Sequence, residues 1–356
     1  MGSYLYLQCG DSMSTNTKVH EVRWNPLLRQ WIIVAGHRGH RPWRPEEKGF
    51  SCPFCPGAPE TRNLGEWDVI VLPNKFPALT MNAPQPTHGV AGLFRARRAI
   101  GVCEVVVETP SHEGDLCDLT LDHAKKVIDV FTEEYLKLGS LKPVKYVAEF
   151  RNKGKEIGVS LTHPHSQIYA LPFIPPRIRC ELKSFRNYMR RRGRCLLCDI
   201  INLEYREKVR LIYENKHFII LLPYFAMWPY EVHVYPKRHV QALPDLSDEE
   251  RFHLADALRV VTAMYNALFD RDLPYMMVIH QKPTDGKDYS YYHMHVEFYQ
   301  PYRDRDKLKY AAGIEWGYWT FTYDGVPEQK ARELREACYR ALKKLNQYLG
   351  QVVAIG

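Results

Sequence analysis

The chain contains one ordered set of parts twice, and this internal repeat constrains its fold more than any other feature. Each half begins with a C-x-x-C pair, continues through an isolated histidine and ends on a histidine-x-histidine strand. The isolated histidine and the closing strand are 51 residues apart in the first half (112 to 163) and 54 in the second (239 to 293). Self-similarity at a nearly fixed spacing indicates repeated structural units, so we predict two domains related by duplication.

Each half also alternates apolar strands with one amphipathic helix. Apolar residues recur at helical spacing between a Thr120 N-cap and Gly139, and again after the capping-box pair Ser247 and Glu250. We predict a further helix at 327–348. The predicted strands are 67–72, 103–108, 144–150 and 163–169 in the first half and 217–222, 231–235, 275–280 and 293–299 in the second.

The predicted fold class is therefore α+β, with two tandem domains that each pack helices on an antiparallel sheet. We place the first domain at 19–175, a linker at 176–194 and the second domain at 195–350. The Pro175-Pro176 pair and the arginine-rich stretch 190–194 mark the linker.

Composition narrows the class of protein. The 356 residues are 45% hydrophobic and 25% charged, as in ordinary globular proteins, and no run of eighteen apolar residues predicts a membrane span. The N-terminus lacks a secretory pattern, so we expect a cytoplasmic protein. The net charge of +8 is spread along the chain, which favours a basic surface over nucleic-acid binding.

The cysteines indicate metal binding. Their number is nine and their spacing is irregular, which argues against a disulfide framework. A C-x-x-C turn with two distant histidines supplies the two sulfurs and two nitrogens of tetrahedral zinc, so we expect two zinc ions per chain. The predicted ligands are Cys52, Cys55, His112 and His163 at the first site and Cys195, Cys198, His239 and His293 at the second.

The second site has an alternative. His280 can join Glu181, His293 and His295 in a histidine–carboxylate site, which would suit iron. His293 cannot easily serve both sets of ligands. We prefer the cysteine set because the internal repeat supports it.

The stretch His163-Pro164-His165-Ser166-Gln167 carries the candidate chemistry. Alternate residues of a strand share a face, so His165 and Gln167 lie beside the zinc ligand His163. Neutral imidazole can attack phosphorus, and a glutamine amide can donate to a phosphate oxygen without adding charge. A glycine-bearing stretch, 152–160, precedes this strand and lets backbone N–H groups approach a phosphate. The duplicate His295 has no such approach loop, so His165 is the predicted nucleophile.

These residues resemble the galactose-1-phosphate uridylyltransferases, a branch of the histidine-triad superfamily, over residues 20 to 345. Histidine-triad hydrolases usually carry a third histidine where this chain has Gln167, which points to the transferase branch. The resemblance implies two tandem histidine-triad-like domains. It rests on Arg23-Trp24-Asn25-Pro26-Leu27, Arg38, Arg41-Pro42-Trp43, residues 52–57, residues 74–79 and residues 163–167.

The resemblance also implies a reaction and its partners. UMP would pass from UDP-glucose to galactose 1-phosphate through a uridylyl group on His165. A segment around 309–315 would bind the hexose in the active site of the other subunit of a homodimer. The implied UDP contacts are Arg38, Arg41, Asn74, Asn152, Gly158, Val159, Ser160 and Gln167, and the implied hexose contacts are Lys309, Tyr310, Gly313, Ile314 and Glu315.

Two other functions compete with this one. A phosphorylase acting on ADP-sugars or dinucleoside polyphosphates would use the same scaffold and histidine but transfer the nucleotidyl group to inorganic phosphate. The sequence separates these poorly, because both need the same first half. A zinc-ribbon nucleic-acid-binding protein would explain the C-x-x-C pairs and positive charge but not His165, Gln167 and the glycine-bearing stretch.

Overall fold

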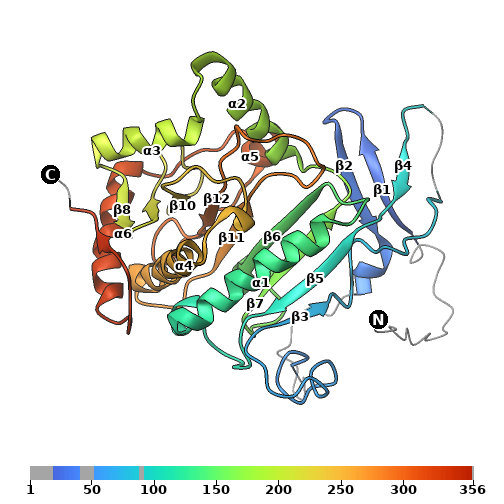
Figure 1. Ribbon diagram of the computed structural model, residues 1–356, viewed down its shortest axis with the longest axis horizontal. Coiled ribbons are helices and arrows are strands. Elements are labelled where there is room, and N and C mark those ends of the chain that lie inside the picture. The colour runs from blue at the N-terminus through green and yellow to red at the C-terminus, as the bar shows by residue number, and fades with distance from the viewer. Residues whose placement is uncertain (1–18, 41–51, 88–91, 355–356) are drawn as a thin grey trace.

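The computed structural model of the chain describes residues 19–40, 52–87 and 92–354 (Figure 1). Its main feature is one sheet of ten strands in which every neighbouring pair is antiparallel. In spatial order the strands are β13 (Gln351–Val352), β8 (Leu211–Glu214), β9 (Phe218–Leu221), β10 (Val232–Pro236), β12 (His295–Tyr299), β11 (Tyr275–His280), β6 (Tyr146–Lys153), β7 (His165–Leu171), β5 (Val102–Val107) and β3 (Ile70–Pro73).

The order of strands confirms the duplication that the repeat predicts. From the centre outward, the first half runs β6, β7, β5, β3 and the second half runs β11, β12, β10, β9. The halves meet where β6 pairs with β11, with Arg151 opposite Met277 and Glu149 opposite Ile279. The fold class is therefore α+β with two similarly ordered halves, and the two halves share a single sheet.

The long helices begin where the capping residues predict. In α1 (Leu121–Gly139), the Thr120 hydroxyl accepts a hydrogen bond from the His123 backbone N–H at 3.2 Å. In α4 (Asp248–Phe269), Ser247 and Glu250 form the reciprocal capping box. Such caps satisfy backbone donors that the first helical turn leaves unpaired.

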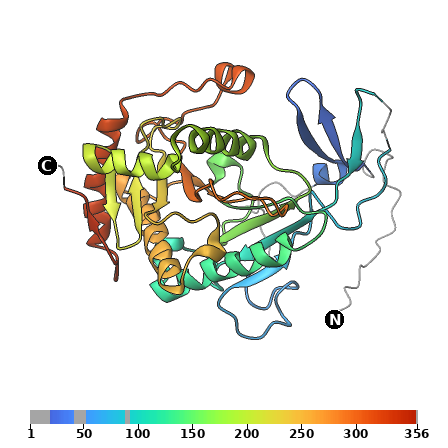
Figure 2. The same ribbon diagram turned by 45° about the horizontal axis from the view of Figure 1, so that its top comes forward.

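Helices cover the two faces of the sheet differently. Figure 2 shows α1 and α4 on one side of the sheet and α2 (Pro176–Arg192) and α3 (Leu196–Glu207) on the other. Alternate residues of each strand serve the two faces: Ile168 packs in the core beneath α1 and α4, whereas Ile219 packs in the core beneath α2 and α3.

Smaller elements complete the described chain. A separate three-stranded sheet has the order β2-β1-β4. Its strands are β1 (His20–Asn25), β2 (Gln30–Ala35) and β4 (Ala96–Arg98), and the remaining helices are α5 (Gly313–Tyr318), α6 (Pro327–Leu342), η2 (Gly36–His40), η3 (Leu116–Asp118), η4 (Lys155–Ile157) and η5 (Leu243–Asp245).

Some details differ from the sequence-based expectation. Most of the predicted linker is the helix α2, which starts with Pro176 in its first turn and buries Ile178, Leu182 and Phe185. The last predicted helix ends at Leu342 rather than 348. The boundaries of the two domains stay a prediction, because one continuous sheet crosses them.

None of the helices in residues 19–40, 52–87 and 92–354 combines the length and apolar character needed to cross a bilayer. The eight cysteines in these ranges are all free thiols. Arg41 lies outside the described residues.

Candidate active site and metal centres

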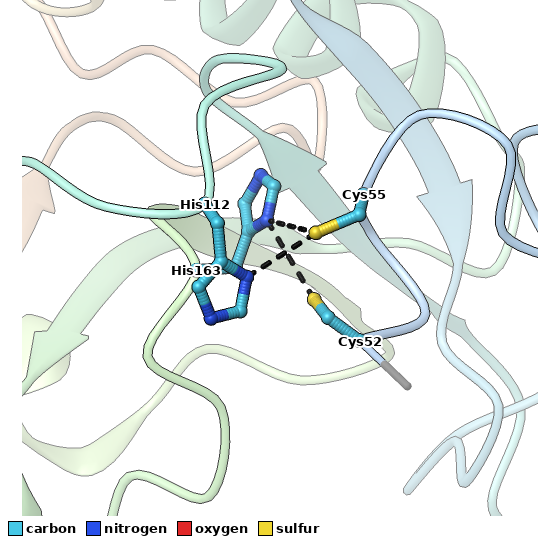
Figure 3. Close-up of side chains that lie close together, drawn as sticks. All are labelled: Cys52, Cys55, His112 and His163. Carbon is cyan, nitrogen blue, oxygen red and sulfur yellow. Dashed lines mark hydrogen bonds between the residues drawn. The ribbon is translucent and has the colours of Figure 1, made fainter. Parts of the chain in front are cut away.

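The first predicted metal site is assembled from three separate parts of the chain. Cys52 and Cys55 lie in one turn, His112 follows β5, and His163 precedes β7; Figure 3 shows the four side chains pointing toward one another. Their ligand atoms all lie within 4.8 Å of one another. The sulfur–Nδ1 distances are 3.6 Å for Cys52–His163, 3.2 Å for Cys55–His112 and 3.7 Å for Cys55–His163.

These distances fit a tetrahedral metal ion. With zinc–sulfur bonds of about 2.3 Å and zinc–nitrogen bonds of about 2.0 Å, a ligand sulfur and nitrogen lie about 3.5 Å apart. The far side of the His163 ring is fixed, because its Nε2–H donates to the Thr109 carbonyl oxygen at 2.8 Å. Burial lowers the pKa of His163, which favours the neutral ring that a metal needs. The Nδ1 lone pair therefore faces the two sulfurs.

The second cysteine–histidine group repeats this arrangement. Cys195 caps α3, Cys198 lies in its first turn, and the ligand atoms of these two and of His239 and His293 lie within 4.8 Å. The sulfur–Nδ1 distances are 3.6 Å for Cys195–His293, 3.8 Å for Cys198–His239 and 3.5 Å for Cys198–His293. The duplicated halves thus bring equivalent residues together, and each group can hold a metal.

The histidine–carboxylate group exists as well, with one member that we did not predict. Glu181, His280 and His295 gather with Glu297, and His293 belongs to the cysteine group instead. The prediction that the two sets compete for His293 was therefore wrong. Glu297 follows His295 by two residues on β12, so the His-x-Glu spacing on one strand face was a usable signal, whereas its contact with Glu181 of α2 and His280 of β11 depends on the fold.

Charge holds this third group together. The Nδ1 atom of His280 lies 3.0 Å from a carboxylate oxygen of Glu181, and the Nε2 atom of His295 lies 3.3 Å from Glu297. Burial opposes ionisation of Glu181, but the interaction with His280 outweighs it and lowers the pKa of this carboxyl to about 2. Two imidazoles and two carboxylates can bind a divalent metal of intermediate hardness.

His165 stands at the start of β7 with its ring orientation fixed. Its Nδ1 atom lies 2.8 Å from the His163 carbonyl oxygen. Because a carbonyl only accepts hydrogen bonds, Nδ1 carries the proton, and the lone pair of the neutral ring is on Nε2. The ring of Phe54, from the first C-x-x-C turn, packs 5.3 Å from the His165 ring. The C-x-x-C turn therefore contacts the His165 ring through Phe54, in addition to the hydrogen bond that His163 provides.

Alternate side chains of β7 point to opposite faces of the sheet, so the candidate site residues share one face. His165, Gln167 and Tyr169 are half-buried on one face, and Ser166 and Ile168 are buried on the other. Two further predicted substrate contacts lie near this face. The Arg38 guanidinium donates to the Tyr169 hydroxyl at 3.3 Å, and Asn152 lies on the adjacent strand β6.

A buried ionic network packs against the opposite face of β7, and no sequence pattern predicted it. The Ser166 hydroxyl donates to Glu108 at 2.5 Å. Arg151 donates to both oxygens of Glu108, at 2.9 and 3.0 Å, and pairs with Asp115 at 2.9 Å. These residues come from different elements, so their partnership follows only from the folded sheet. The network holds β7 in the register that presents His165.

The other predicted UDP contacts lie in two loops. Asn74 follows β3, where its side-chain oxygen accepts a hydrogen bond from the Phe76 backbone N–H at 2.9 Å. Gly158 ends η4 in a left-handed conformation (φ 81°), and Val159 and Ser160 continue the connection toward β7.

The predicted hexose-binding segment lies away from the body of the molecule, where α5 projects beyond α2 and α3 (Figure 2). Lys309 and Glu315 are buried, and Glu315 accepts hydrogen bonds from the Ala312 backbone N–H and the Thr322 hydroxyl. Tyr310, in contrast, is 75% exposed. Gly313 and Ile314 are also exposed.

We expect Gly154→Ala to destabilise the loop that leads to His165. Gly154 has φ +101°, and an added Cβ would lie 2.3 Å from the Pro274 Cβ. Backbone strain and this overlap together should lower the free energy of unfolding by about 3 kcal/mol. Gly193→Ala is the matched control. Gly193 also has positive φ (66°) but open space around it, so we expect a loss of about 1 kcal/mol there. Urea denaturation measures both, and equal losses would contradict the role of the Pro274 contact.

Comparison with known proteins matches the chain along most of its length. Two family profiles match in tandem: "Galactose-1-phosphate uridyl transferase, N-terminal domain" over residues 11–175 and the corresponding "C-terminal domain" over residues 181–346. A Thermotoga maritima protein named galactose-1-phosphate uridylyltransferase is 42% identical over 317 residues, which are 89% of this chain and 98% of that protein.

Solved structures agree with the sequence matches. A structure described as "Structure of uridylyltransferase" aligns with a TM-score of 0.83 and 44% identity, over 90% of this chain and 99% of that chain. An ADP-glucose phosphorylase from Arabidopsis thaliana with bound ADP-glucose aligns with a TM-score of 0.68 and 26% identity, over 88% of this chain and 98% of that chain.

Proposed function

Because the chain belongs to the galactose-1-phosphate uridylyltransferase family, we propose that it transfers UMP from UDP-glucose to galactose 1-phosphate. The orientation of the His165 ring is the observation that carries this proposal. The hydrogen bond from Nδ1 to the His163 carbonyl leaves the lone pair on Nε2, as a nucleophile toward phosphorus requires.

The reaction proceeds as two displacements at one phosphorus atom. His165 Nε2 first attacks the α-phosphorus of UDP-glucose, a nitrogen–phosphorus bond forms, and glucose 1-phosphate leaves with the bridging oxygen. A phosphate oxygen of galactose 1-phosphate then attacks the same phosphorus, the nitrogen–phosphorus bond breaks, and UDP-galactose leaves. The imidazole returns to its neutral state, so no outside reactant is needed.

We infer that Gln167 assists both steps. It shares the half-buried face of β7 with His165, and its amide can donate to a non-bridging oxygen that gains negative charge in each transition state. We propose that guanidinium and amide side chains, together with backbone N–H groups of the glycine-bearing loop, bind the phosphates of UDP-glucose. The proposed UDP contacts are Arg38, Arg41, Asn74, Asn152, Gly158, Val159 and Ser160.

In this proposal the metal ions have a structural role and take no part in the reaction. Cys52, Cys55, His112 and His163 would hold one zinc ion, which fixes the backbone carbonyl that orients His165. Cys195, Cys198, His239 and His293 would hold a second zinc ion in the other half. The group of Glu181, His280, His295 and Glu297 is a third position, where iron or zinc can bind. Eight free thiols in the described chain fit a reducing, cytoplasmic compartment.

The hexose site would be completed by a second copy of the chain. The exposed residues Tyr310, Gly313 and Ile314 form the outer surface of the projecting α5 segment, where they can reach a neighbouring subunit. Lys309 and Glu315 lie beneath them and hold the segment in shape, since Glu315 caps α5. We therefore propose a homodimer in which each segment contributes to the site of the other chain.

One alternative keeps the same chemistry but changes the acceptor. The likeness to an ADP-glucose phosphorylase suggests inorganic phosphate, in place of galactose 1-phosphate, as the acceptor of the nucleotidyl group. A phosphorylase would form an adenylyl rather than a uridylyl adduct and release it with phosphate alone. The lower identity of that structure, 26% against 44%, makes it the second candidate.

The covalent step can be tested by intact-mass measurement of the protein after incubation with UDP-glucose alone. We expect the mass to rise by one uridylyl group, and galactose 1-phosphate to remove it, because the first displacement needs no acceptor. ADP-glucose incubated in parallel should add no adenylyl group. Adduct formation with ADP-glucose, released by inorganic phosphate, would favour the phosphorylase, and no adduct with either sugar nucleotide would exclude the two-step mechanism.

A further inference from the structure

A fourth group of metal-binding side chains lies outside all the sites described above. His217 immediately precedes β9, and Glu249 and His253 lie in the first turns of α4; one ligand atom from each lies within 4.8 Å of the others. We propose that these three residues form a separate surface site for one divalent transition metal ion of the zinc, cobalt or nickel class. It shares no residue with the cysteine–histidine groups or with the Glu181 group.

The two histidines carry the proposal because each has a buried ring nitrogen without a hydrogen bond among the described residues. His253 is only 9% exposed, and its Nδ1 atom has no hydrogen-bond partner among the described residues. The buried Nε2 atom of His217 also makes no hydrogen bond to any described residue, although it lies 3.4 Å from a Glu249 oxygen. Buried polar atoms in folded proteins are nearly always satisfied, so such a pair indicates a missing ligand.

The backbone around the group holds the ligands in place before any metal binds. Glu249 and His253 are four residues apart on α4, so they share one face of the helix. The Asn215 side chain accepts a hydrogen bond from the His217 backbone N–H at 3.1 Å and donates to the His253 carbonyl oxygen at 2.8 Å. The turn that carries His217 is therefore tied directly to the helical turn that carries His253.

The chemistry of the three ligands selects the class of metal. Two imidazoles and one carboxylate suit zinc, nickel and similar ions, whereas calcium and magnesium prefer oxygen ligands alone. The Glu249 side chain is 55% exposed, so solvent can reach the site and water can occupy the remaining coordination positions. A bound ion would join the N-terminal turns of α4 to the start of β9.

Lys216 competes with the metal for the carboxylate. Its ammonium group lies 2.6 Å from the Glu249 oxygen, but both side chains are exposed, and such ion pairs contribute little. Because the lysine charge also repels a cation, its removal should tighten metal binding. Removal of Lys216 should therefore raise the metal affinity, whereas removal of a ligand should lower it.

The test uses the full-length protein, dialysed with a weak chelator so that only tightly held metal remains, in equilibrium dialysis against nickel(II). We expect the wild type to bind about one more nickel ion per chain than Glu249→Gln or His253→Gln does. We expect the affinity for that ion to fall at least tenfold in either variant and to rise in Lys216→Met. Lys344→Met, which removes the same charge from an exposed contact with Asp270 at 3.9 Å, should match the wild type.

Two further readouts separate this site from its neighbours. Nickel at the proposed site has no thiolate ligand, so its binding should add no sulfur-to-metal charge-transfer absorption, which exchange into a cysteine group would add. Glu249 and Lys216 are exposed, so their variants should fold normally. An unchanged nickel count in Glu249→Gln, or an unchanged affinity in Lys216→Met, would overturn the proposal.

Discussion

His165→Asn is expected to lower the turnover number by about 10⁴-fold or more while leaving the fold and the bound metal intact. The asparagine amide can still donate to the His163 carbonyl oxygen, as the Nδ1–H of His165 does at 2.8 Å, so the strand start keeps its local hydrogen bond. What disappears is the nitrogen lone pair, and with it the covalent intermediate. Steady-state kinetics with UDP-glucose and galactose 1-phosphate measure the loss, and metal analysis and thermal unfolding confirm the fold.

The duplication supplies a matched control for this variant. His295 occupies the equivalent position on β12, and its Nδ1 atom likewise lies 3.2 Å from the carbonyl oxygen of His293, two residues earlier. His295→Asn should still acquire a uridylyl group from UDP-glucose, because the second half lacks the glycine-bearing approach loop. Turnover that survives in His165→Asn, or an adduct that disappears from a folded His295→Asn, would move the nucleophile elsewhere.

Cys52→Ser is expected to remove one zinc ion and lower the unfolding free energy by about 4 kcal/mol or more, because loss of a structural metal is among the most damaging single changes. Activity should fall with it, since the turn that holds Cys52 and Cys55 also places Phe54 against His165. The zinc content by elemental analysis and the midpoint of thermal unfolding are the measurements.

Cys180→Ser provides the comparison for a cysteine outside the metal groups. Cys180 is an exposed free thiol on α2, so its replacement should change neither the zinc content nor the unfolding midpoint measurably. If Cys52→Ser kept its full zinc content, the assignment of Cys52 as a ligand would be wrong.

Local signals in the sequence were sufficient for much of the fold. The capping residues Thr120 and Ser247 predicted the starts of α1 and α4, because a cap is a contact between residues three apart. Apolar runs predicted eight strands, although β3 begins three residues later than predicted, at Ile70. They did not predict the strands β1, β2, β4, β8 and β13. The internal repeat then predicted which cysteines and histidines gather in each half, and the structure brings both sets of four together.

What the sequence could not provide depends on contacts between distant elements. The pairing of β6 with β11 joins the halves, and no local pattern specifies it. Glu297 lies two residues after His295 on β12, but its other metal-group partners, Glu181 and His280, belong to α2 and β11. Residues 176–194 were interpreted as a linker because of the Pro175-Pro176 pair and the arginine-rich stretch 190–194. Proline is, however, favoured in the first turn of a helix, and arginines in the last turn complement the helix dipole.

The continuous sheet limits how this protein can move. Transferases with two separate lobes often enclose their substrates by rotation about a hinge between the lobes. Here the hydrogen bonds between β6 and β11 occupy the place where such a hinge would be, from Tyr275 opposite Lys153 to Ile279 opposite Glu149. Admission of one sugar phosphate and departure of the other must therefore depend on rearrangement of loops, while the sheet that carries His165 stays rigid.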